Sequence, residues 1–510
     1  MRLKKLECEG MVSISQKYRL FFLLVVILYL LTRLFNLSLL PIFMDETNYI
    51  YWAKGVAASN AHWFVSLSAG KPFPLIWFMV LFIKILPSDA YLLAGRLPSV
   101  VFGLMTLLGT YKLASFIFES KRVGYLAAFL YVLVPFTLFH DRMAIYDSML
   151  SAMMIWAGFF VFKTARSFKL RDATLWGIFL GSALLAKASA LSYVLLTPIA
   201  FTFLTLRKIS GGDFQRVLKL VLVAFVVSQL VANVQVASRG YGEYLVKSVD
   251  YTPGERILAT LTTVFFPNLQ LTWQWLRAYF TAPLLLTGFA SYAYVLLGRN
   301  FRVGLSLLLL TIAPWLAFSL LGQIYFPRYL LFTAPLFLVV TANFLVKILH
   351  LSRHAFLLFS ICLLFPLMHF DFLLLTDPSK APFPEIDHRQ YVANSPSGYG
   401  LAAVFEALDA ELQKNEVTLV VQSDYYGQLL NATNLEFFDN DQLTIIRQWP
   451  NLDDQEKIIS LARKKTIFVL TEDYLIPTYR DFFGRLAASE IKFGEKPGGK
   501  DSVYLLKSGI

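Results

Sequence analysis

The sequence is poor in charged residues. Asp, Glu, Lys and Arg make up 16% of its 510 residues, whereas soluble domains carry about 25%. Hydrophobic residues reach 57% and the mean hydropathy is +0.57, so we expect a polytopic α-helical membrane protein. The formal charge of +12 does not indicate a nucleic-acid partner, because the Lys and Arg residues lie in short loops between apolar runs, the pattern of membrane orientation.

Cysteine and the common cofactor motifs are also scarce. The two cysteines are Cys8, in the charged N-terminus, and Cys362, inside an apolar run, and such different settings do not predict a disulfide. No Gly-rich loop follows a predicted strand, so nothing points to a nucleotide sugar or ATP as a direct donor. No two candidate ligands show a characteristic metal-site spacing. No metal ligand or certain cofactor is therefore predicted, and the need for a divalent cation is left open.

The apolar runs predict about eleven transmembrane helices between residues 18 and 376, because a span needs roughly 20 mainly apolar residues. A further run, 72–86, is shorter and carries Pro72, Pro74 and Lys84, which favours a re-entrant or interfacial helix. If this run does not cross, nearly every dense basic loop lies on the side of the basic N-terminus, as the positive-inside rule requires. We therefore expect a multi-pass protein of the plasma (inner) membrane with a cytoplasmic N-terminus and an extracytoplasmic first loop, 41–93.

The last part of the chain differs in character. From Asp377 the charge and the Asn content rise, and short β-like runs alternate with helical stretches. This alternation is typical of a small α/β domain. We predict a transmembrane domain over 1–376 and a soluble extracytoplasmic α/β domain over 377–510, with the following elements in the latter: strands at Val417–Val421, Thr466–Leu470 and Val503–Leu506, and helices at Leu401–Lys414 and Asp453–Arg463.

Two acidic clusters fall on the predicted outer side. Asp45 and Glu46 follow the first apolar run, and a carboxylate beside an apolar wall can remove a proton from a hydroxyl. The alternative is that Asp45 caps an interfacial helix or lies in a solvated turn. The second cluster, from His140 to Asp147, includes Arg142, and its simpler interpretation is a capped hairpin with an Asp–Arg pair.

Three isolated cations lie on the same predicted side. They are Lys71 before Pro72, Lys187 between two apolar runs, and Arg328 in a Tyr-Phe-Pro-Arg-Tyr stretch. Each alone is explained by a side chain that reaches the membrane surface. Together they could neutralise a phosphate or diphosphate at the level of the lipid headgroups.

These residues carry a family resemblance. The chain resembles the polyprenyl-phosphate-sugar-dependent membrane glycosyltransferases of the GT-C class, which include the protein O-mannosyltransferases and the lipid A aminoarabinose transferases. The resemblance covers about residues 15–350 and rests on six short pieces in order: Asp45-Glu46 with Tyr49; Lys71-Pro72; Gly95-Arg96-Leu97-Pro98-Ser99; Arg142 with Asp147; Leu185-Ala186-Lys187; and Arg328-Tyr329-Leu330. The chain departs from the family's Lys-Pro-Pro at Lys71-Pro72-Phe73-Pro74, and from its Lys-Gly-Pro at Lys187-Ala188-Ser189.

The resemblance implies a reaction and assigns roles. A sugar would pass from a polyprenyl-phosphate donor to a lipid, glycan or protein acceptor outside the cytoplasm, with inversion of the anomeric centre. Asp45 would be the general base. Asp147 is the second residue assigned to catalysis, and Asp147 and Arg142 would position the first loop or the sugar. Lys71, Lys187 and Arg328 would hold the phosphate as it leaves, and the complete set assigned to substrate binding is Glu46, Tyr49, Lys71, Arg142, Lys187, Arg328 and Tyr329.

A transporter of a lipid-linked glycan or small solute is the alternative function. Transporters usually place ionisable residues near the bilayer midplane on broken helices in repeated halves. Here the ionisable residues cluster at one interface, and no second half repeats the first. A non-catalytic scaffold would leave the acidic and basic clusters unexplained.

Overall fold

The computed structural model describes residues 19–206, 213–238, 240–248, 261–422, 428–448, 452–498 and 501–510. These form two compact units, each described by itself below. The helical unit comprises the residues through Leu37 together with Phe64–Leu75 and Arg96–Thr376, and the α/β unit comprises Ser38–Trp63, Ile76–Gly95 and Asp377–Ile510. Most of the first predicted loop, 41–93, thus groups with the C-terminal residues. The two predicted domains, 1–376 and 377–510, stay a prediction.

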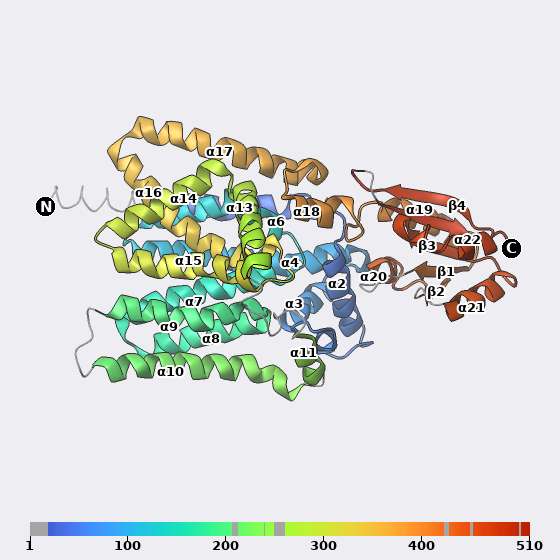
Figure 1. Cartoon of the computed structure of the whole chain (residues 1–510), viewed down its shortest axis with the longest axis horizontal. Coiled ribbons are helices and arrows are strands. Elements are labelled where there is room, and N and C mark those ends of the chain that lie inside the picture. The colour runs from blue at the N-terminus through green and yellow to red at the C-terminus, as the bar shows by residue number, and fades with distance from the viewer. Residues whose placement is uncertain are drawn as a thin grey trace. The chain divides into compact units, whose positions relative to one another are not determined.

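The helical unit is built from apolar helices joined by short turns (Figure 1). The first helix runs over residues 19–34. The others are α4 (Tyr91–Ile117, entering from the α/β unit), α5 (Lys121–Leu133), α6 (Pro135–His140), α7 (Asp147–Ser167), α8 (Leu170–Ala186), α9 (Leu191–Thr205), α10 (Asp213–Ala232), α11 (Tyr241–Ser248), α13 (Phe266–Phe280), α14 (Ala282–Leu297), α15 (Phe301–Leu321), α16 (Ala334–Leu351) and α17 (Arg353–Thr376), with the short helices η3 (Ala188–Ala190) and η7 (Pro327–Thr333).

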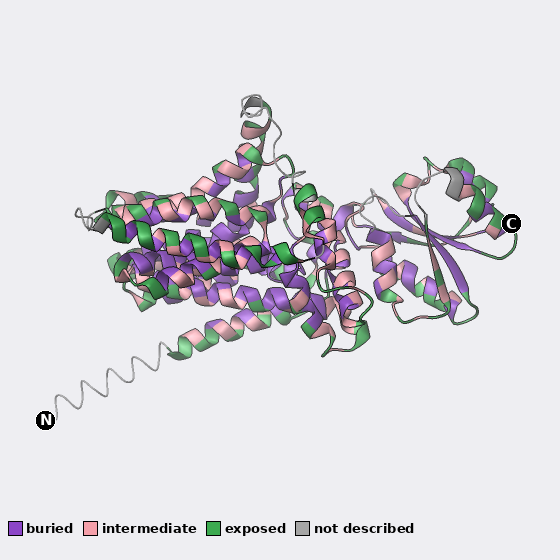
Figure 2. Cartoon of the chain, turned by 90° about the horizontal axis from the view of Figure 1, so that it is seen from below, coloured by how far each residue is buried: buried purple, intermediate pink, exposed green. Residues whose placement is uncertain are grey.

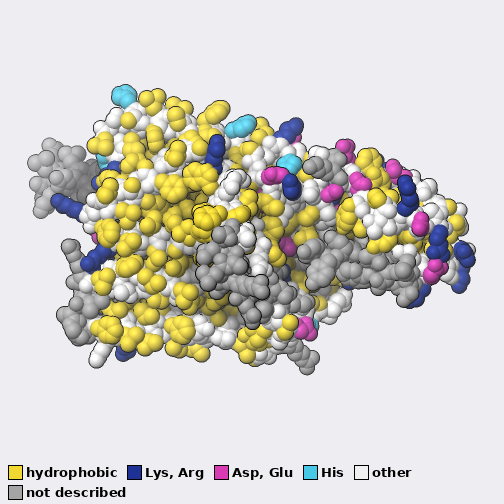
Figure 3. All heavy atoms as spheres, in the orientation of Figure 1, with side chains coloured by type: hydrophobic (Ala, Val, Ile, Leu, Met, Phe, Trp, Pro, Cys, Tyr) yellow, Lys and Arg dark blue, Asp and Glu magenta, His cyan; other side chains and the backbone are white. Residues whose placement is uncertain are grey.

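Two helices form the centre of this unit. In the most apolar 18-residue stretch of each helix, 83% of the residues are buried on α7 and 89% on α16 together with η7. The corresponding share is only 22% on α10 and on α17. Figure 2 shows the general pattern, with buried residues inside the bundle and exposed ones on its outside. In Figure 3 hydrophobic side chains cover most of the visible surface of the bundle, whereas charged ones gather on the α/β part. A bundle with an apolar outer surface is what a bilayer requires.

A pair of glycines sets the packing of α8 on α10. A Cβ atom at Gly177 would lie 2.5 Å from the carbonyl oxygen of Ala224, and one at Gly181 would lie 2.6 Å from that of Ser228. The two glycines are four residues apart, so they lie on one face of α8. Such small-residue spacing lets two membrane helices approach closely.

Seven helices among the described residues are long and apolar enough to cross a membrane, or eight if the bent pair Thr263–Phe280 and Ala282–Leu297 is one span. The predicted polytopic helical fold is confirmed, while the number eleven stays a prediction, since α5 and α8 have only 13 and 17 residues. In the ambiguous 72–86 run the structure has only α3 (Pro74–Ile83), of 10 residues. At 1.5 Å per residue α3 is about 15 Å long, half of the roughly 30 Å hydrocarbon core, as expected of a segment that does not cross.

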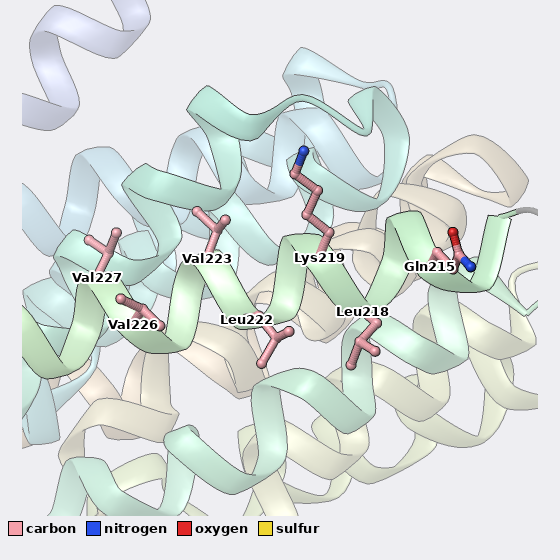
Figure 4. A pocket seen from close by; sticks show the side chains of 7 residues that line it. All are labelled: Gln215, Leu218, Lys219, Leu222, Val223, Val226 and Val227. Carbon is pink, nitrogen blue, oxygen red and sulfur yellow. The ribbon is translucent and has the colours of Figure 1, made fainter.

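The outer face of α10 carries a shallow apolar groove of about 400 Å³ (Figure 4). It is lined by Gln215, Leu218, Lys219, Leu222, Val223, Val226 and Val227. Since α10 is mostly exposed and apolar, this groove suits a lipid chain and holds none of the predicted site residues.

The α/β unit contains the predicted C-terminal sheet. Its elements are α2 (Met44–Ala57) and α3 from the first loop, then α18 (Glu385–His388), α19 (Leu401–Leu412), β1 (Val417–Gln422), α20 (Gln428–Glu436), β2 (Leu443–Gln448), α21 (Leu452–Ala462), β3 (Phe468–Glu472), α22 (Arg480–Arg485), β4 (Ser489–Glu495) and β5 (Ser502–Lys507). The strand order is β2-β1-β3-β5-β4. Strands β1, β2 and β3 are parallel, and β5 runs antiparallel to β3 and β4.

The three predicted strands coincide with β1, β3 and β5, and the two predicted helices with α19 and α21. The central strands are buried along their whole length, so they are uniformly apolar and easy to recognise. Strands β2 and β4 were missed because edge strands carry charge: β4 reads Ser-Glu-Ile-Lys-Phe-Gly-Glu and is mostly exposed.

Candidate active site

An ion pair joins the start of α7 to the end of α8. Asp147 is the first residue of α7, where the helix dipole favours a negative charge. Lys187 directly follows α8 with an extended backbone, and its Nζ lies 2.7 Å from Asp147 Oδ1. The Asp147 side chain is 3% exposed and that of Lys187 is 24% exposed. The pair is therefore buried on the carboxylate side and accessible on the ammonium side.

Aromatic rings and a second cation lie beside this ion pair. The Lys187 Nζ lies 4.0 Å from the centre of the Tyr329 ring, a favourable cation–π arrangement. Arg328 precedes Tyr329 in the chain, and its guanidinium carbon lies 4.9 Å from the Phe326 ring centre. Both Arg328 and Tyr329 belong to η7, which packs against α7.

Lys71 is fixed near the same place by its neighbours. Its backbone N–H donates to the Ser66 carbonyl at 3.0 Å. The following Pro72 carbonyl accepts hydrogen bonds from the hydroxyls of Ser66 and of Tyr146, the residue just before Asp147. Lys71 and Arg328 are both close enough to act electrostatically on Lys187. The structure thus brings together Lys71, Lys187, Arg328, Tyr329 and Asp147.

Three cations, Lys71, Lys187 and Arg328, share this cluster with the Asp147 carboxylate. Lys187 lies between α8 and the candidate span that begins at Ala188, and its burial lowers the pKa to about 8, with Asp147 opposing the shift and Arg328 and Lys71 adding to it. A phosphate group would relieve the repulsion among the cations and accept hydrogen bonds from them.

Arg142 is placed differently. Its guanidinium donates to the backbone carbonyls of Thr32, Arg33, Phe35 and Asn36, at distances of 2.7–3.2 Å. These carbonyls lie at the C-terminal end of the first helix, where backbone acceptors lack partners within the helix. Arg142 therefore fixes the point at which the chain leaves the first helix for the first loop, and its predicted contact with substrate stays a prediction.

The remaining predicted residues lie on α2, in the α/β unit. Glu46 is fully buried, and its Oε2 accepts a hydrogen bond from the Phe43 backbone N–H at 3.0 Å. Tyr49 is 4% exposed, with its ring 5.8 Å from that of Trp52. Asp45 is only partly buried and occupies the second position of the helix. The helix begins after Phe43, so the carboxylate that closes its N-terminus belongs to Glu46, and the capping alternative considered for Asp45 is not what the structure shows.

A buried polar network beside the cation cluster was missed from the sequence. Asp141 accepts hydrogen bonds from Tyr29, Tyr131 and Ser148, and Arg33 Nε lies 3.6 Å from it with both side chains fully buried. The signal was present, because an arginine inside the first apolar run requires a partner. Among the described residues no group of three or more His, Cys, Asp and Glu is arranged to hold a metal ion.

Comparisons with known proteins found one family match and several similar solved structures. Residues 70–234 match the family described as dolichyl-phosphate-mannose-protein mannosyltransferase. None of the curated protein sequences matches the chain. The match over 70–234 includes Lys71, Asp147 and Lys187.

Solved structures extend the likeness to the whole fold. ArnT from Cupriavidus metallidurans, bound to undecaprenyl phosphate, is 13% identical with a TM-score of 0.57 over 96% of this chain and 98% of ArnT. The archaeal oligosaccharyltransferase AglB from Archaeoglobus fulgidus, in complex with an inhibitory peptide and a dolichol-phosphate, is 15% identical with a TM-score of 0.56 over 92% of this chain and 71% of AglB. The resemblance predicted from the sequence is thereby confirmed: residues 70–234 match the family described as dolichyl-phosphate-mannose-protein mannosyltransferase, and the fold is similar to that of ArnT.

Proposed function

We propose that the protein is an integral membrane glycosyltransferase that transfers a sugar from a polyprenyl-phosphate donor to an acceptor hydroxyl, with inversion. The observation that carries this proposal is the ion pair of Lys187 with Asp147, with Lys71 and Arg328 close enough to act electrostatically on Lys187. The undecaprenyl phosphate in the ArnT structure and the dolichol-phosphate in the AglB structure support the same donor class.

The cluster would act mainly on the leaving group. As the bond between the sugar's anomeric carbon and the phosphate oxygen breaks, negative charge grows on the phosphate. Cations fixed in place before the reaction stabilise this charge without reorganisation. Asp147 would keep Lys187 charged and directed, and it would lie beside the phosphate without forming a bond to it.

Asp45 would act on the acceptor. The acceptor oxygen attacks the anomeric carbon from the face opposite the phosphate, and its proton passes to the Asp45 carboxylate. One carbon–oxygen bond forms as another breaks, and the lipid phosphate leaves as the anion, so no acid catalyst is needed. Glu46 would keep the helix N-terminus intact, and Tyr49 would pack behind it.

The acceptor and the orientation belong to the same proposal. We infer a lipid, glycan or protein acceptor on the extracytoplasmic side, eleven spans, a cytoplasmic N-terminus and an extracytoplasmic C-terminal domain. The positive-inside distribution of the loops supports this orientation. Reporters fused after Gly70 and after Pro87 should both be read outside, whereas a cytoplasmic signal after Pro87 would contradict the eleven-span topology.

The decisive experiment is a transfer assay with purified protein. Undecaprenyl phosphate carrying labelled mannose, glucose or aminoarabinose is supplied, and membranes from cells that lack the protein provide the acceptor. We expect transfer from at least one donor, lost in Lys187→Ala. Transport of label across proteoliposomes without formation of a new glycosidic bond would instead support the transporter.

A further inference from the structure

Within the α/β unit, the start of α2, the helix that carries Asp45, is held by contacts with C-terminal residues. A short segment of this unit, residues 394–400, lies against the N-terminus of α2. The Pro396 carbonyl accepts a hydrogen bond from the Met44 backbone N–H at 3.0 Å, and another from Gln428 Nε2 at 3.0 Å. Met44 immediately precedes Asp45, so this carbonyl joins the first residue of α2 to α20.

The contact is close as well as hydrogen-bonded. A Cβ atom at Gly398 would lie 2.2 Å from the carbonyl oxygen of Ile42 and 2.9 Å from its nitrogen. The Tyr391 ring lies 4.5 Å from the ring of Phe43. Only a residue without a side chain fits at position 398 while the chain before Asp45 keeps this path.

Further contacts hold α2 along its length. The Asn431 side chain on α20 donates to the side-chain oxygen of Asn48. Lys54, near the other end of α2, donates to the Leu435 carbonyl at 3.3 Å and lies 4.6 Å from the Phe438 ring centre. Helix α2 is thus attached to the C-terminal part of the α/β unit at its beginning, middle and end.

The segment that holds α2 is itself fixed by a buried ion pair. Lys496 Nζ lies 3.2 Å from Glu472 Oε1, with side chains 1% and 5% exposed. The same ammonium donates to the carbonyls of Asn394 and Ser395 at 3.2 and 3.1 Å, and Ser395 Oγ donates to Glu472 Oε2 at 2.8 Å. Glu472 is the last residue of β3 and Lys496 directly follows β4. Residues at the ends of these two strands therefore hold the beginning of the 394–400 segment.

This arrangement has no role in the reaction as described so far. Burying an ion pair gives little net stability, because desolvation offsets most of the attraction. What such a pair provides is a fixed geometry, because each hydrogen bond of Lys496 and Glu472 requires its partner at a defined position. A general base needs such fixation, because misplacing a reacting group by about 1 Å can cost on the order of 100-fold in rate.

We propose that the Glu472–Lys496 pair and the 394–400 segment are a positioning device that sets the place of Asp45. Glu472, Lys496, Pro396 and Gly398 are positioning residues that act through α2 and do not touch the substrate. The inference rests on the proposed role of Asp45 and gives the soluble domain a part in catalysis.

The main test is Gly398→Ala in the full-length protein. The added methyl group must displace Ile42, so we expect turnover to fall at least about tenfold while the donor KM stays within about twofold. The matched control is Gly484→Ala on α22, where a Cβ atom meets nothing within 4 Å, and its turnover should be unchanged. Hydrogen exchange over residues 41–50 should become faster in Gly398→Ala only, because the Met44 amide loses its acceptor.

A double-mutant cycle separates this inference from the proposed function. In an Asp45→Asn background, Gly398→Ala should cause little further loss, because both changes act on one carboxylate. If Asp45→Asn keeps full activity, the base assignment itself is wrong. If Asp45→Asn is inactive but Gly398→Ala matches the wild type in turnover and exchange, or if the two losses multiply, the positioning role is wrong.

Asn431→Ala keeps the test decisive if Gly398→Ala does not fold. It removes one side-chain contact to α2 and should lower turnover about threefold, roughly one weak hydrogen bond, with faster exchange over 41–50. Asn415→Ala, at an exposed turn of the same domain, is its control. Equal turnover and exchange in the two Asn variants would overturn the proposal.

Discussion

Two carboxylates at opposite ends of one turn have different surroundings. Asp141 is fully buried and receives hydrogen bonds from two tyrosines and a serine, with Arg33 beside it. Asp147, where the turn ends and α7 begins, has Lys187 at 2.7 Å, and this lysine remains partly exposed.

The two carboxylates therefore have different kinds of partner. The hydrogen-bond donors to Asp141 lie on the first helix, α5 and α7, so this group joins the three helices. At Asp147 the accessible partner is a cation with two more cations nearby. Such a pair can accept an anionic ligand without leaving a buried charge uncompensated.

The largest expected effect is on the structural side of this comparison. Asp141→Asn leaves the Arg33 charge buried without its counter-charge, and breaking a buried pair in this way costs about 3–5 kcal/mol. We expect poor expression and a strongly lowered melting temperature in detergent. Ser148→Ala, which removes one donor, should cost only ~1 kcal/mol. A wild-type melting curve for Asp141→Asn would show that the network is not structural.

The next effect concerns the third carboxylate, Asp45. Asp45→Asn should lower turnover at least about 100-fold, because general-base catalysis typically contributes 10²–10⁴-fold, while the melting temperature stays nearly unchanged. Its matched control is Glu46→Gln. Since Glu46 accepts the Phe43 N–H, this change should weaken the helix start and affect turnover less. If the activity loss of Asp45→Asn follows the unfolded fraction instead, the residue is structural.

A smaller effect is expected at the cation cluster. Lys187→Ala and Arg328→Ala each remove a charge-assisted contact worth roughly 1.5–3 kcal/mol, so affinity for undecaprenyl phosphate should fall by about one to two orders of magnitude. Lys163→Ala is a close control, because Lys163 lies 3.2 Å from a buried carboxylate, Asp172, and its side chain is 30% exposed. Equal binding by all three variants would mean that Lys187 and Arg328 only reach the membrane surface.

The smallest effect is a pH dependence. Burial lowers the pKa of Lys187 to about 8, so its protonated fraction, and with it donor affinity, should fall as the pH rises through that value. The loss is at most about tenfold per pH unit. Titration of undecaprenyl phosphate binding between about pH 7 and 9 measures it, and Lys187→Arg should flatten the profile because arginine stays charged. A profile for Lys187→Arg that is as steep as that of the wild type would assign the titration to another group.

Several features were recognisable from local patterns. Long apolar runs predicted the membrane class, and the buried strands β1 and β3 were visible as short apolar segments. Prolines and length identified 72–86 as a segment unlike the spans. Each of these features depends on residues that are neighbours along the chain, so composition and periodicity are sufficient to predict it.

Other features required distant partners. The alternative considered for Asp45 was the cap of α2, but Glu46 accepts the Phe43 N–H at the helix start, since the boundary depends on the path of the chain at Phe43. Arg142 was expected to position the first loop or the sugar, and only the structure shows its hydrogen bonds to the carbonyls at the end of the first helix. Nothing near Pro396 or Gly398 in sequence reveals that they hold the helix of Asp45.

The sequence by itself therefore determined that the chain is a multi-pass membrane protein with a C-terminal sheet. It also identified the charged residues beside apolar runs, whose burial costs free energy unless they are paired or functional. Only the tertiary structure decided which of these charges pair with one another and which cations gather in one cluster. The physical reason is that the energy of a buried charge is set by the groups within a few ångströms of it. For Asp141 and Lys187 those groups come from segments that only the fold brings near.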